Sequence, residues 1–194
     1  MKIAIASSGL GHVARGIETW ALDTAVALSQ LSVNSYPLLG DSTNNQEPIT
    51  NNSLNVTLFS GVPLPQSVKC HVVALPCLKR GDWTTQQLSN WAPKWTWRWG
   101  WTSAYDLEQK SFWRLLWPIL RDEEFDILHV QDPLLADLCR RYREKGKLRT
   151  KVILAHGTEE SVEFLAKFDY VQHLAPWHLE QAVKQLEEGR GLHH

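Results

Sequence analysis

The sequence has few cysteines, one methionine, no long apolar run and no excess of either charge. Its three cysteines, Cys70, Cys77 and Cys139, have neither the pattern of a disulfide framework nor the close spacing of a metal site. We therefore expect a cytoplasmic protein in a reducing compartment. The first apolar run covers only residues 3–6, which is too short for a signal peptide or a membrane span, so we expect neither.

The absence of a charge excess bears on the partners. The 20 basic and 21 acidic side chains give a formal net charge of -1, and no local basic patch stands out, so we expect no nucleic-acid partner. Metal-ligand spacings such as HxxxH or DxD do not occur in the sequence. We therefore expect no bound metal and no cofactor.

What is present is an ordinary globular composition, with 43% apolar and 21% charged residues in a chain of 194, which suits one domain with a sizeable core. Expected strands cover residues 2–7, 33–39, 55–59, 71–75, 126–130, 151–155 and 170–174. Expected helices cover residues 17–31, 106–121, 133–145, 157–168 and 176–188. This alternation predicts an α/β domain with a doubly wound, mostly parallel, Rossmann-like sheet, whose ligands bind at the carboxyl ends of the strands.

Several residues are expected to define the helix ends. We expect Asp106 to cap the second helix and Asp132 to cap the third, with Pro133 in the first turn of the third helix. Pro118 is expected to kink the second helix, and Gly146 to end the third.

The loop after the first strand is rich in glycine. Gly9, Gly11 and Ala14 form a G-x-G-x-x-A pattern, which is typical of dinucleotide-binding turns. The helical period begins several residues later than in such a turn, and no acidic residue ends the second strand, which argues against a dinucleotide. Gly16 lies at the helix start, where backbone N–H groups can approach a diphosphate, and Arg15 would add a positive charge. A plain glycine N-cap is the alternative for Gly16.

Three segments have the order and spacing of a known family. They read GLGHVARGIETW at 9–20, FDILHVQDP at 125–133 and VILAHGTEE at 152–160. In these segments the chain resembles the N-terminal, acceptor-side domain of the retaining glycosyltransferases of family 4, which have the GT-B architecture. The resemblance covers residues 1–188 and implies that 189–194 are a linker start or a tag remnant.

The resemblance implies an enzyme that transfers a sugar from a nucleotide-activated donor to an acceptor hydroxyl, with retention of configuration. The acceptor would be a sugar or a lipid-linked acceptor, and a C-terminal donor domain, missing here, would be needed for full activity. The alternative is a non-catalytic Rossmann-like module that binds a nucleotide or a sugar. A membrane-associated scaffold is a third class.

The resemblance also implies roles for single residues. His156 would be the catalytic residue, because an imidazole beside the transferred sugar can bind a hydroxyl or support the departing phosphate. Gly16 and Arg15 would bind the donor diphosphate, whose charge is stabilised by a helix dipole and basic groups instead of a metal. Taken without the family, a histidine before a glycine is more often structural.

The resemblance implies that five residues bind the acceptor: Asp132, His12, Glu18, Trp97 and Trp99. Asp132 would orient an acceptor hydroxyl or cap the following helix. Glu159 and Glu160 would be helix-start carboxylates or bind acceptor hydroxyls. His129 lies inside a strand and is expected in the core.

Tryptophan is concentrated in one segment, since eight of the ten tryptophans fall between residues 83 and 117. Within residues 94–101, tryptophans alternate with Lys94, Arg98 and small residues, which favours an extended segment with one aromatic face. Such a face suits stacking on acceptor sugar rings, peripheral contact with a membrane, closure over an active site, or packing onto the domain core.

Overall fold

The computed structural model describes residues 1–13, 16–33, 54–91 and 103–191. In these residues six strands form one all-parallel sheet with the order β3-β2-β1-β4-β5-β6. The strands are β1 (Lys2–Ser7), β2 (Asn55–Ser60), β3 (His71–Ala74), β4 (Ile127–Val130), β5 (Lys151–His156) and β6 (Tyr170–His173). The helices are α1 (Gly16–Val33), α2 (Trp83–Trp91), α3 (Ala104–Asp122), α4 (Pro133–Glu144), α5 (Val162–Leu165) and α6 (Pro176–Gly191). The predicted doubly wound α/β fold is confirmed.

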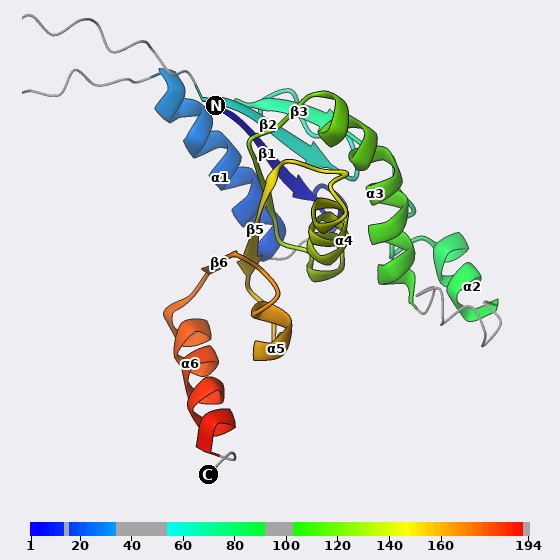
Figure 1. The fold of residues 1–194 in the computed structure, drawn as a ribbon. Helices are drawn as coiled ribbons and strands as arrows, with labels where there is room; N and C mark the ends of the chain where they lie inside the picture. The colour runs from blue at the N-terminus through cyan, green and yellow to red at the C-terminus, as the bar shows by residue number, and fades with distance from the viewer. Residues whose placement is uncertain (14–15, 34–53, 92–102, 192–194) are drawn as a thin grey trace, which may run out of the picture.

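The central strand β1 is buried on both faces, because helices cover both sides of the sheet (Figure 1). Ile3 and Ile5 belong to the core cluster that includes Ala21 and Ala25 of α1. The alternate residues of β1 belong to the larger cluster on the opposite face, which also contains the buried side chains of α3 and α4. This double burial explains why β1 reads as a continuous apolar run instead of an alternating one.

Two predictions about elements need correction, and one helix was missed. Val33 is the last residue of α1 and does not start a strand, and the rest of the predicted strand at 33–39 lies outside the described residues. Strand β1 is paired with β2 on one edge and with β4 on the other, so neither edge of β1 is free for a strand at 33–39. The cap of α3 is Ser103, whose Oγ accepts a hydrogen bond from the backbone N–H of Asp106 at 3.1 Å. Helix α2 was not predicted at all.

The expected start and end of α4 occur as predicted. Helix α4 begins at Pro133, and Gly146 follows its end with a φ of +66°. Helix α3 continues past Pro118 to Asp122. Of the helices that the structure describes, none is both long enough and apolar enough to cross a membrane.

Candidate functional site

The loops that follow β1 and β4 diverge at the middle of the sheet, because β2 lies on one side of β1 and β4 on the other. Ligands of doubly wound sheets bind in the crevice that such a reversal of strand order creates, at the carboxyl ends of the strands. The next strand, β5, ends beside β4 at His156. The segments 9–20, 125–133 and 152–160 therefore come together at the carboxyl ends of the strands.

A buried carboxylate, Glu108 of α3, organises the floor of this region. It is fully buried and accepts hydrogen bonds from Arg80 through the backbone N–H at 2.8 Å, Nε at 3.0 Å and Nη2 at 2.6 Å. His12 Nε2 and Ser8 Oγ donate to the same carboxylate at 3.0 Å and 2.9 Å. Burial alone raises the pKa of Glu108, but the hydrogen bonds from Arg80 and His12 outweigh it and lower that pKa. Glu108 is therefore ionised and fixes the loop after β1.

The second carboxylate, Asp132, joins the loops after β1 and β4. Its Oδ2 accepts the backbone N–H of Ser8 at 3.2 Å, and its Oδ1 lies 3.5 Å from the hydroxyl of Tyr105. Asp132 holds the N-cap position of α4 but its side chain makes no capping hydrogen bond, so the predicted capping role is wrong for the side chain. Burial, with the charge of Glu108 in the same direction, raises the pKa of Asp132 against the opposing effects of Ser8 and Arg80.

A cavity of about 510 Å³ opens above these groups and is lined by Glu18, Arg80, Tyr105, Gln131 and Asp132 among others. Glu18 is only 6% exposed, and its Oε2 has no partner within the described part of the chain. Gln131 is 4% exposed, and both polar atoms of its amide are likewise without a partner there. Buried polar atoms are normally paired, so these side chains fit a ligand that both donates and accepts hydrogen bonds.

The second part of the site is a group of three imidazoles around the end of β5. Nδ1 of His156 lies 3.0 Å from Nδ1 of His173, its neighbour in register on β6. The ring of His178, at the start of α6, lies 4.7 Å from that of His156 between centroids. Burial, followed by the neighbouring imidazoles, lowers the pKa of His156. His156 is therefore neutral at neutral pH.

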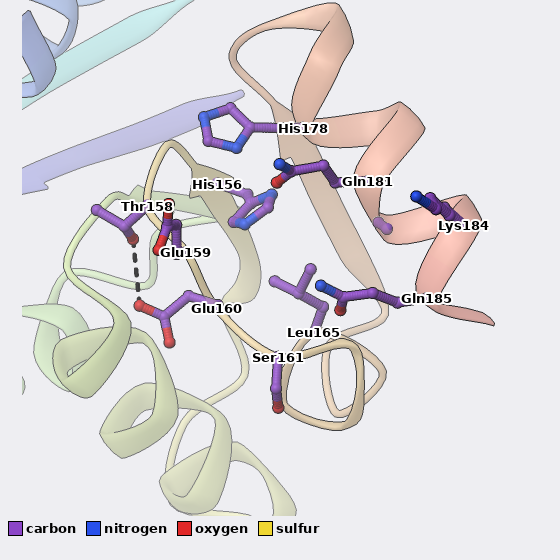
Figure 2. A pocket seen from close by; sticks show the side chains of 11 residues that line it. His156, Thr158, Glu159, Glu160, Ser161, Leu165, His178, Gln181, Lys184 and Gln185 are labelled. Carbon is purple, nitrogen blue, oxygen red and sulfur yellow. Dashed lines mark hydrogen bonds between the residues drawn. The ribbon is translucent and has the colours of Figure 1, made fainter. Parts of the chain in front are cut away.

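A cavity of about 570 Å³ lies beside His156 and is lined on its far side by α6 (Figure 2). Figure 2 shows Thr158, Glu160 and the imidazole of His156 around its inner wall, with Gln181 and Gln185 opposite. Thr158 and Glu160 also line the crevice cavity, so the two cavities adjoin. Nε2 of His156 is buried and, among the described residues, has no hydrogen-bond partner.

The structure brings some of the predicted site residues together. Glu18 and Asp132 line the crevice cavity, and His156 lines the adjoining one. His12 does not line the crevice cavity, because its ring is turned to Glu108. Gly16 is the exposed first residue of α1, and a Cβ there would meet no atom of the described residues within 4 Å, its chain neighbours and the backbone of its own helix left aside. Arg15, Trp97 and Trp99 lie outside the described residues.

The glycine-rich loop is explained by packing. Gly11 has a φ of +89°, and a Cβ there would lie 2.4 Å from a methyl group of Val62. A Cβ on Gly9 would lie 2.6 Å from Oε1 of Glu18. These two glycines thus allow close approach within the protein, which removes the need for a dinucleotide to explain them.

The two glutamates after His156 are not helix-start residues, because α5 begins at Val162 behind the N-cap Ser161. Glu160 instead accepts a hydrogen bond from Thr158 Oγ1 at 3.1 Å (Figure 2). Within the described residues, no group of three or more histidine, cysteine, aspartate or glutamate side chains is placed to hold a metal ion.

Sequence reasoning missed Arg80, Tyr105, Glu108, Gln131, His173 and His178. The sequence held one signal for Glu108, which is its helical spacing with Phe112 and Leu116. In the structure all three side chains are fully buried. A carboxylate within an apolar stripe must be paired, which marks it as part of a polar network.

No match to this chain is found among models of known protein families, among curated proteins or among solved structures.

Proposed function

We propose that this chain is the acceptor-side half of a retaining glycosyltransferase, which transfers a sugar from a nucleotide-activated donor to an acceptor hydroxyl. The observation that supports this most is the crevice at the reversal of strand order, where Glu18 and Gln131 are buried with unpaired polar atoms beside Asp132. A sugar hydroxyl both donates and accepts hydrogen bonds, so it can satisfy a carboxylate and an amide together.

In this proposal the acceptor occupies the crevice and the transferred sugar lies toward His156. Asp132 and Glu18 orient the acceptor hydroxyl, and the raised pKa of Asp132 makes it a better proton acceptor than an ordinary aspartate. Neutral His156 supplies a ring nitrogen to a sugar hydroxyl or to the departing phosphate. The exposed N-terminus of α1 at Gly16, which itself carries no side chain, favours a diphosphate. The donor would be held by a second domain, as the family resemblance implies.

Binding to the chain itself is the first test. A panel of neutral sugars and cyclitols, nucleotide-sugars and NAD would be titrated into the ¹⁵N-labelled chain. We expect the neutral sugars to shift the signals of Glu18, Gln131 and Asp132. Gln131→Ala should weaken that binding about 10-fold, the loss of one or two hydrogen bonds, while Gln30→Ala on the exposed face of α1 should not. Tight NAD binding without sugar binding would favour the nucleotide-binding module.

Transfer is the second test and requires the polypeptide that joins this domain to a donor-binding domain. His156→Ala is expected to reduce kcat by about 100-fold or more, because it removes a group that contacts the reacting atoms. His71→Ala, at the opposite edge of the sheet on β3, is the matched control. Unchanged turnover in His156→Ala would remove this residue from the mechanism.

A further inference from the structure

The crevice cavity has more negative than positive side chains on its walls. Of its described lining residues, four are carboxylates and one is cationic. The carboxylates are Glu18, Asp132, Asp137 and Glu160, and the cation is Arg80. Arg80 donates to the buried Glu108 through its backbone N–H, Nε and Nη2, so its charge is already balanced by a residue outside the lining. Arg80 is therefore not a free counter-ion for the carboxylates of the cavity.

One of the four lining carboxylates is balanced as well. Asp137 of α4 pairs with Arg140 at 2.7 Å and with Arg141 at 2.6 Å. Arg140 pairs further with Glu144, so these four side chains together have no net charge. The other three carboxylates form no ion pair with any residue that the structure describes: Glu18, Asp132 and Glu160. The cavity therefore holds negative charge for which the described chain supplies no cationic partner.

Glu18 is the buried one of these three carboxylates, whereas Asp132 and Glu160 are half-buried. Its side chain reaches the loop after β1, since a Cβ on Gly9 would lie 2.6 Å from its Oε1. Glu18 lies in the first turn of α1, where the helix dipole stabilises a negative charge. That position supports the charge but leaves Oε2 without a hydrogen-bond donor among the described residues. A buried carboxylate oxygen without a donor is costly, so it points to a ligand that donates.

The same ligand has to satisfy an amide, because both polar atoms of the buried Gln131 side chain lack a partner in the described chain. An ammonium group offers three N–H donors and no acceptor, which suits carboxylates. A hydroxyl both donates and accepts, which suits the amide. A metal ion could not accept from the amide N–H of Gln131, and no group of three ligating side chains is placed for one within the described residues.

We propose that the crevice binds an acceptor with a primary amine, an amino sugar or an aminocyclitol, whose ammonium group lies against the carboxylate of Glu18. The hydroxyls of this ligand bind the amide of Gln131, and Asp132 and Glu160 add to the attraction for its charge. That the ligand is the acceptor of a transferred sugar rests on the proposed function. The preference of the crevice for an amine does not.

Matched ligands test the preference on the ¹⁵N-labelled chain. Glucosamine is compared with glucose, and scyllo-inosamine with scyllo-inositol, at a slightly acidic pH where both amines are protonated. We expect the amine of each pair to bind about 10-fold more tightly than its neutral partner, the ratio that one hydrogen bond to a charged group contributes. Both members should shift the signals of Glu18 and Gln131. N-acetylglucosamine, in which the amine is an uncharged amide, should lose the advantage.

Three variants assign the preference to its residues. Glu18→Gln keeps the size of the side chain and removes the charge, so each amine should bind within about 2-fold of its neutral partner. Gln131→Leu should weaken both members of a pair alike and leave their ratio unchanged. Glu123→Gln is the control, because Glu123 is exposed at the end of α3 beside Lys2, at the opposite end of the strands, and it should change neither affinity nor ratio.

Equal affinity for the amine and its neutral partner in the wild-type chain would overturn the inference, and so would the absence of binding by all four ligands. A preference that survives in folded Glu18→Gln would overturn the role of that carboxylate. The wild-type comparison decides the matter even where the variant fails to fold. Cyclohexylamine that binds as tightly as glucosamine would show a plain cation site and refute a sugar ligand. A chain that prefers amines but transfers no sugar, when joined to its donor-binding domain, would refute the proposed function alone.

Discussion

Replacement of Glu108 by glutamine is the most direct test of the buried network beneath the site. The carboxylate accepts from Arg80 at both oxygens and from His12 and Ser8. Glutamine offers one accepting oxygen, so its NH₂ group would face donors of Arg80 or His12 whichever way the amide is turned. Hydrogen bonds to a charged group contribute about 1.5–3 kcal/mol each, and removal of one partner of a buried ion pair costs about 3–5 kcal/mol.

The expected loss of unfolding free energy is at the low end of the range for a broken ion pair. The reason is that the Arg80 side chain is 17% exposed and regains part of its hydration. We expect Glu108→Gln to lower the free energy of unfolding by about 3 kcal/mol at neutral pH, or the midpoint of thermal unfolding by roughly 6–12 °C in a chain of this length. Urea unfolding followed by tryptophan fluorescence and circular dichroism measures it. The exposed Glu144, paired with Arg140, is the matched control, and Glu144→Gln should cost about 0.5 kcal/mol or less.

The contribution of Glu108 to the stability depends on pH with a definite sign. Because the folded state lowers the pKa of Glu108 below its ordinary 4.5, the stabilisation by its charge is complete above pH 4.5 and disappears as the pH falls through the folded-state pKa. The difference between wild type and Glu108→Gln should therefore shrink in acid. A loss below about 1 kcal/mol at neutral pH, or one that is the same in acid, would refute the reasoning.

Two further predictions concern the same end of the sheet. Gly61→Ala is expected to destabilise the chain by about 2 kcal/mol or more, because its Cβ would lie 2.0 Å from the carbonyl oxygen of Ser8, whereas Gly81→Ala meets nothing within 4 Å and should be neutral in the same urea assay. Burial lowers the pKa of His129 from 6.5 to about 4, so the unfolded state gains a proton first as the pH falls through that window. The wild type should lose up to about 3 kcal/mol relative to His129→Leu between pH 6.5 and 4, and equal pH profiles would contradict the burial of a neutral ring.

The sequence was informative wherever one local signal sufficed. The strands of a parallel sheet are buried on both faces, so runs such as Ile3 to Ala6 are visible without alignment. Asp132 was found because it follows the end of a strand, and the carboxyl ends of parallel strands converge. Glu18 was named only through the family resemblance of the first loop and helix. The contact of His156 with His173 depends on the register of two strands, which a strand pattern does not contain.

Other features could not be predicted from any short stretch of the sequence. Helix α2 has one buried side chain, Thr85, so it has no apolar stripe from which a period could be recognised. Arg80 has no local feature that points to Glu108, which lies 28 residues away on α3. Val33 favours a strand by its β-branched side chain, but the helix that precedes it continues through it.

The strand order also has a consequence for how the chain is made. Strands β1 and β2 lie near the N-terminus and can pair early, but the crevice does not exist until β4 joins β1, and the hydrogen bond from Ser8 to Asp132 closes a separation of 124 residues. During synthesis one edge of β1 therefore stays unpaired while more than half of the chain emerges. Such distant pairing slows folding and leaves an apolar strand edge open to other chains, so we expect expression at low temperature, or with a chaperone, to raise the yield of folded protein.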